Sequence, residues 1–127
     1  MQNSRESALA LGRTLAEHKG GDVLVLDLEP CQAWTDFFVL ATATSSTHLR
    51  GLASAVDEWA HAAGLKLFNV PRIANDEGWV LLDYGDLVIH LMTATARSFY
   101  ELEKLWFQAV STKIEAPVPT LPPEALA

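Results

Sequence analysis

The chain has little cysteine and little positive charge, and each shortage excludes a class of protein. With a single cysteine, Cys31, it cannot build a disulfide framework, and it suits a reducing compartment. Nine lysines and arginines stand against sixteen aspartates and glutamates, which gives a formal net charge of −7. A chain without a basic stripe cannot gain the counterion release that dominates affinity for nucleic acids, so little direct RNA contact is expected. A basic protein partner fits this charge better.

Long hydrophobic runs are also missing. No apolar stretch approaches the roughly 20 residues that a membrane-spanning helix needs. Residues 1–6 lack the basic region followed by an apolar one that marks a secretory signal. We therefore expect a cytoplasmic protein without membrane contact. Its 127 residues, half of them hydrophobic, suffice for one domain with a single core.

Residues 79–92 predict a β-hairpin. Gly85-Asp86 suits a two-residue type II′ turn, because glycine supplies the positive φ at the first central position. That turn fixes the register, and the alternation of side chains then gives a wholly apolar face that must be buried: Val80, Leu82, Tyr84, Leu87, Ile89 and Leu91. The other face is mixed and too apolar for an ordinary solvated surface: Trp79, Leu81, Asp83, Val88, His90 and Met92.

Hydrophobic spacing predicts the other elements. Helices are expected over residues 4–18, from the capping hydroxyls of 44–47 to Gly64, and over 97–106. Short apolar strands are expected over 22–28, 37–42 and 66–70. The last helix should dock on the sheet through Phe99, Leu102 and Trp106.

The order of these elements favours an α/β fold. Helices and strands interleave without strict alternation, which predicts a mixed five-stranded sheet with flanking helices. Pro71 marks the end of the third strand, since proline cannot donate to a sheet ladder.

This domain is assigned to residues 1–110. Residues 111–127, rich in proline, are predicted to be an extended or disordered tail.

Few residues offer catalytic chemistry. Asp83, Asp86 and His90 form the only close acidic and imidazole grouping, and Asp83 and His90 would share a face of the hairpin. Spacing supplies no third ligand, so a metal or general-base site is not favoured. Gly20-Gly21 precedes a strand instead of opening a helix, so it is not a phosphate cradle. We expect no catalytic residues, no metal and no cofactor.

Two blocks resemble a known family. The hairpin followed by Arg97–Trp106 closely resembles the ribosomal silencing factor family, also called the Iojap-like proteins. Upstream, Thr35–His48 is similar to the family's Thr-Asp pair, apolar strand and Thr-x-Thr-Ser-Ser turn. The resemblance spans residues 4–107 or so. Ala43 stands where the family usually has glycine, and the loop at 31–34 is atypical.

The resemblance implies a nucleotidyltransferase-like topology and a function that is not enzymatic. Family members dock on the large-subunit ribosomal protein numbered fourteen, block joining of the small subunit and lower translation when nutrients are scarce, while organellar relatives act in large-subunit assembly. The expected partner-binding residues are Trp79, Asp83, Tyr84, Asp86, His90, Arg97 and Tyr100. Among them Trp79 beside Asp83 best suits an anchor facing a basic partner.

Two alternatives stay open. One is a small metal-dependent nucleotidyltransferase relative that uses Asp83 and His90. The other is a homodimeric adaptor in ribosome assembly, in which the mixed face of the hairpin pairs with itself.

Overall fold

The computed structural model describes residues 4–31, 35–67, 72–74, 78–100, 104 and 109–115. Its six-stranded sheet has the order β3-β4-β5-β2-β1-β6. The strands are β1 (Gly21–Asp27), β2 (Phe37–Ala43), β3 (Arg72–Ala74), β4 (Trp79–Asp83), β5 (Leu87–Thr93) and β6 (Val110–Lys113). β2 and β5 are parallel, and the other neighbouring pairs are antiparallel. The predicted mixed α/β sheet is confirmed, with β6 as an additional strand.

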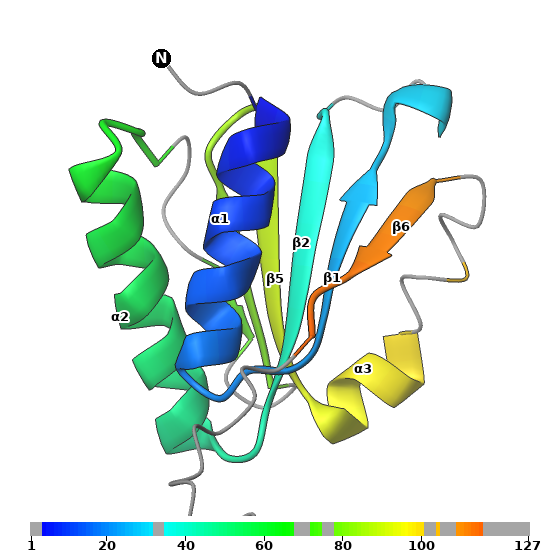
Figure 1. The fold of residues 1–127 in the computed structure, drawn as a ribbon. Helices are drawn as coiled ribbons and strands as arrows, with labels where there is room; N and C mark the ends of the chain where they lie inside the picture. Colours follow the sequence, from blue (N-terminus) through cyan, green and yellow to red (C-terminus); the bar gives the residue numbers. More distant parts are fainter. Residues whose placement is uncertain are drawn as a thin grey trace, which may run out of the picture.

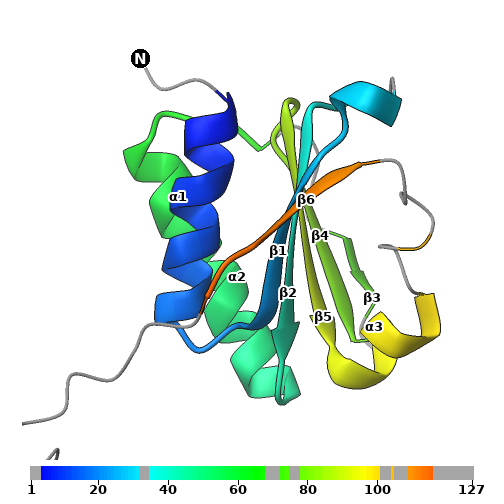
Figure 2. The same cartoon turned by 45° about the vertical axis from the view of Figure 1, so that its right-hand side comes forward.

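Helices lie on both sides of this sheet. Figures 1 and 2 show α1 (Ser4–Glu17) and α2 (Ser46–Ala62) on one side and α3 (Ala94–Tyr100) on the other. A short 3-10 helix, η1 (Glu29–Cys31), follows β1. In the part of the chain that the structure describes, no helix is both long and apolar enough to cross a membrane. The nucleotidyltransferase-like topology stays a prediction.

The start of α2 is held by the predicted hydroxyl cap and by a histidine. The Ser45 hydroxyl accepts the His48 backbone N–H at 3.0 Å, as an N-cap does. The His48 Nδ1 accepts the Thr44 backbone N–H at 2.9 Å. The ring proton therefore sits on Nε2, which lies 3.0 Å from the His18 carbonyl oxygen and donates to it. This side chain ties the start of α2 to the end of α1.

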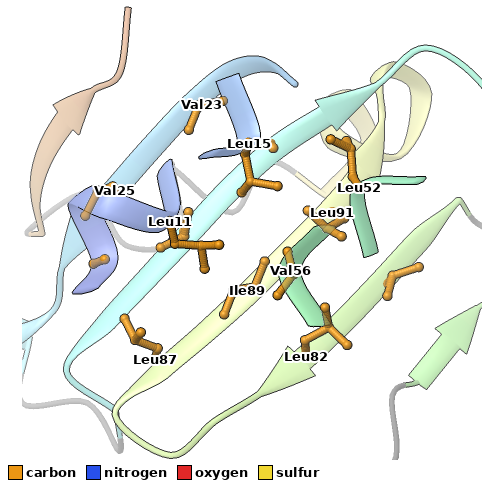
Figure 3. Packing of buried hydrophobic residues seen from close by; sticks show 14 of the residues in the cluster. Leu11, Leu15, Val23, Val25, Leu52, Val56, Leu82, Leu87, Ile89 and Leu91 are labelled. Atoms are coloured by element: carbon orange, nitrogen blue, oxygen red, sulfur yellow. The ribbon is translucent and has the colours of Figure 1, made fainter. Parts of the chain in front are cut away.

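The hairpin has the predicted register. Val80 pairs with Leu91 and Leu82 with Ile89, and Gly85 has a φ of 88° at the turn. All six residues predicted for the apolar face are at most 9% exposed. They meet α1 and α2 in one hydrophobic cluster, in which Leu11 and Leu15 of α1 and Leu52 and Val56 of α2 cover Ile89 and Leu91 (Figure 3). Full burial of such a side chain contributes about 1.5–3 kcal/mol.

The prediction of a strand over residues 66–70 is wrong at the two of these residues that the structure describes. Lys66 and Leu67 form no strand, and 68–71 lie outside the described residues. β3 instead begins after Pro71, and its Ile73 pairs with Val80 of β4. β3 has only three residues, which are too few to show an alternation of apolar and polar side chains. Its pairing depends on the open edge of β4, and the hydropathy of the sequence does not reveal that edge.

β6 crosses the predicted domain boundary. Residues 111–113, assigned above to a tail, belong to a strand that pairs with β1 through Val25 and Thr112. Beyond the strand, the Ile114 backbone N–H donates to the Val23 carbonyl at 2.9 Å, and its side chain packs against the main cluster. The edge of β1 needs a hydrogen-bonding partner, and this segment supplies it. The sheet therefore includes residues 111–113, and Ile114 packs beside it, while residues 116–127 lie outside the described residues.

The prediction for the last helix is wrong at Phe99. α3 begins at Ala94, three residues before the predicted start, and Ala96 packs into a second cluster on this face of the sheet. Phe99 is 78% exposed, so it is not buried against the sheet as predicted. Because Ala96 is small, the helix approaches the strands at that residue. Leu102 and Trp106 lie outside the described residues.

Candidate protein-docking site

The mixed side of the hairpin belongs to the second cluster, on the α3 side of the sheet. Val88, His90 and Met92 of β5 are buried there, and Trp79 and Leu81 of β4 are half-buried against them. Asp83, four residues after Trp79 on the same strand, is also half-buried. We call Trp79, Leu81 and Asp83 the hairpin face. The predicted sharing of one face by Trp79 and Asp83 is confirmed, although neither side chain is fully exposed.

Trp79 is hydrogen-bonded to His90. Its indole Nε1–H donates to the His90 Nδ1 at 3.2 Å, and the ring centroids are 5.7 Å apart with a tilt of 42°. On the far side, Phe38 of β2 meets the imidazole edge-on at 4.5 Å. His90 is 3% exposed, and this burial lowers its pKa from 6.5 to about 4. The imidazole is therefore neutral at pH 7.

Asp83 and His90, the predicted acidic and imidazole grouping, form hydrogen bonds to different residues. The Asp83 Oδ1 accepts the Gly85 backbone N–H at 2.8 Å, which closes the hairpin turn, while His90 accepts from Trp79. Over the described ranges no cluster of three or more His, Cys, Asp or Glu residues could hold a metal ion. Asp83 and His90 therefore have structural partners within the hairpin.

Residues 35–37, which lead into β2, hold the hairpin turn in place, although the sequence did not predict them as part of the site. The Thr35 hydroxyl donates to the Gly85 carbonyl at 2.8 Å. The Phe37 backbone N–H donates to the Asp86 carbonyl at 3.1 Å. Asp86 is exposed at this turn. The sequence signal for this contact is the Thr-Asp pair that precedes β2. Thr35 is 5% exposed in the structure, so its hydroxyl needs an acceptor within the protein.

Tyr84 faces the other way. It is 9% exposed on the side covered by α1 and α2, so it does not share the face of Trp79. Its hydroxyl is buried and finds no hydrogen-bond partner within the described residues. Burial raises the pKa of this phenol, and the nearby Asp57 carboxylate raises it further. Beside it, a cavity of about 400 Å³ lies between the start of α1, the end of α2 and the hairpin turn.

Arg97 supports β2 and β1 instead of the hairpin. Its Nη1 donates to the Thr42 hydroxyl at 2.8 Å and lies 3.5 Å from the Gly21 carbonyl oxygen. Thr42 and Trp79 both pair with Met92, from opposite sides, so Arg97 reaches the same row of the sheet as Trp79. Tyr100 ends α3, and its side chain lies outside the described residues.

Comparisons with known proteins agree with this fold. A family model described as "Ribosomal silencing factor during starvation" matches residues 1–125. The chain is 37% identical over 101 residues to "Ribosomal silencing factor RsfS" of Treponema pallidum, across 79% of this chain and 89% of that protein. It is 34% identical over 97 residues to mouse "Mitochondrial assembly of ribosomal large subunit protein 1", across 72% of this chain but only 41% of the mouse protein. A crystal structure of a Chromobacterium violaceum protein matches with a TM-score of 0.77 and 26% identity, over 93% of this chain and 98% of that one.

Proposed function

Because the chain belongs to the ribosomal silencing factor family, we propose that it binds the large ribosomal subunit in the cytoplasm and blocks joining of the small subunit. Translation then falls when nutrients are scarce. The proposed contact is the large-subunit ribosomal protein numbered fourteen. The mechanism needs only occupancy of the joining surface, so no substrate is converted and no cofactor is used.

The hairpin face is the proposed docking surface, and one observation carries this choice. Trp79 is a half-buried aromatic side chain at one end of β4 that donates a hydrogen bond to His90, and Asp83 stands at the other end of the strand on the same face. Partly exposed aromatic side chains at the centre of an interface commonly dominate binding energy, because docking removes their remaining surface from water. Asp86 is exposed at the turn beyond Asp83, where it also lines the cavity beside Tyr84. Arg97 supports the other end of the surface through Thr42.

The charge of the chain supports a basic partner. A net charge of −7 speeds encounter with a positively charged surface, and it makes association sensitive to salt. The screening length falls from about 10 Å at 0.1 M salt to about 3 Å at 1 M, so the association rate should fall over that range.

Subunit joining tests the proposal. Purified protein is mixed with large and small subunits, without added nucleotide, and the products are separated by sedimentation. We expect stoichiometric inhibition of joining that Trp79→Ala weakens by roughly 30-fold, equivalent to about 2 kcal/mol. Trp59→Ala is the matched control, because Trp59 is a half-buried tryptophan on α2, on the opposite side of the sheet. Equal loss in both variants would refute the hairpin face as the docking surface.

The same assay separates the alternatives. An enzyme would act in catalytic amounts or lose its effect with a chelator. A homodimeric adaptor that pairs through the hairpin face would change its own sedimentation when Trp79 is replaced, in the absence of ribosomes.

A further inference from the structure

The indole of Trp79 is held in place by a buried acceptor. The donor and acceptor come from neighbouring strands but not from directly opposed residues, since Trp79 pairs with Met92 and Leu81 pairs with His90. This diagonal separation is within reach of aromatic side chains. The 3.2 Å bond from Nε1–H to Nδ1 therefore spans the hairpin and fixes both torsions of the tryptophan side chain.

The tautomer of His90 follows from this bond. An indole nitrogen can only donate, so the His90 Nδ1 carries no proton and Nε2 carries it. Phe38 packs on the imidazole from β2 at 4.5 Å with an interplanar angle of 69°, which restricts rotation of the ring. His90 is thus wedged between side chains of two neighbouring strands, and its acceptor nitrogen points at Trp79.

We propose that His90 is a positioning residue for docking, which fixes the Trp79 indole so that its ring surface, and not its N–H, meets the partner. This inference rests on the proposed function. The N–H is already bonded to His90, so the partner need not supply an acceptor. The chemistry that fits an indole ring is a lysine or arginine side chain, through its aliphatic stem and its cationic head. That choice agrees with the basic partner expected from the net charge of −7.

Fixing the indole before docking reduces the entropy lost on binding. Tryptophan has only two side-chain torsions, so the cost of ordering it at an interface lies at the low end of the range for side chains, a weakening of about 2- to 3-fold. His90→Phe keeps an aromatic ring in the buried site but removes the acceptor, so it should weaken binding to isolated large subunits by about 2- to 3-fold. His90→Asn should restore part of that loss, since the Asn side-chain oxygen can accept near the position of Nδ1.

The test combines affinity with a direct probe of the indole. Binding of each variant to isolated large subunits is measured in the native and the Trp79→Phe backgrounds, and hydrogen exchange of the Trp79 Nε1–H is followed by NMR in the free protein. We expect faster exchange and weaker binding in His90→Phe. The Trp79→Phe background has no indole N–H, so His90→Phe should not weaken binding any further in that background.

Three results would overturn the inference. They are unchanged binding in His90→Phe, an equal loss in both backgrounds, or binding of His90→Asn no better than that of His90→Phe. The proposed function fails differently. If Trp79→Ala leaves large-subunit binding intact, the hairpin face does not dock, while the exchange measurement still reports whether His90 holds the indole.

Discussion

Lowering the pH should destabilise the protein through one buried side chain. His90 is 3% exposed, and burial lowers its pKa from 6.5 to about 4. Between these values the unfolded chain binds a proton that the folded protein does not bind. Stability therefore rises with pH across this window and is lost as the pH falls from about 6.5 towards 4. A neutral His90 carries no such penalty at pH 7.

The size of the effect follows from the shift. One pKa unit corresponds to about 1.4 kcal/mol, so His90 should cost the folded state about 3 kcal/mol at pH 4 relative to pH 7. His90→Phe removes that cost, and it also removes the buried Nε2–H, which has no hydrogen-bond partner in the described residues. It leaves the Trp79 N–H without its acceptor, which costs about 1 kcal/mol at every pH and offsets a gain of similar size from the loss of the unpaired Nε2–H. The variant should therefore match the native protein to within about 1 kcal/mol at pH 7 and be more stable by about 3 kcal/mol at pH 4, so the difference between the two stability curves should widen as the pH falls.

Urea unfolding at a series of pH values measures this widening difference in stability. Native protein, His90→Phe and His61→Phe are compared, and the free energies are extrapolated with a shared slope. His61→Phe is the control, because it removes a histidine from an exposed position on α2 and should keep the native pH dependence. Parallel curves for the native protein and His90→Phe between pH 4 and 7 would refute the reasoning, since the penalty would then not come from His90.

Three further substitutions test other parts of the structure. Tyr84→Phe removes a buried hydroxyl without a partner in the described residues, so the free energy of unfolding should rise by about 1 kcal/mol in urea titrations; a fall would reveal a partner. Gly78→Ala should lower it by about 2 kcal/mol, because Gly78 has a φ of 66° and an added Cβ would lie 2.5 Å from the Thr93 hydroxyl oxygen. Asp83→Asn keeps an acceptor for Gly85 but removes a charge, so association with large subunits should slow at low salt and much less at high salt; an equal change at both salt concentrations would contradict a charge effect.

The hairpin was predictable because local chemistry determines it. A positive φ at Gly85 sets the turn, and the period of two residues then assigns every side chain to a face. The edge strands were not predictable in the same way. β3 and β6 are three and four residues long, and each exists because a longer neighbour, β4 or β1, leaves hydrogen-bonding groups open.

Part of the site followed from the same alternation. It placed Trp79 with Asp83 on one face and left Tyr84 on the other. The bond from Trp79 to His90 depends on rotamers and on a diagonal contact, which the sequence pattern does not encode. Arg97 could not be placed either, because its partner Thr42 lies 55 residues away along the chain.

The division of the hairpin into two faces separates the residues of the core from those of the proposed docking surface. Val80 and Leu82 are buried against α1 and α2, so their truncation should act through the core. Trp79 and Asp83 alternate with them along the same strand and face the other side of the sheet. A docking residue on such a strand is held more rigidly than one on a loop. The proposed blocking of subunit joining requires that one surface of the protein be occupied by the partner, and a paired strand within a sheet holds its side chains rigidly enough for that role.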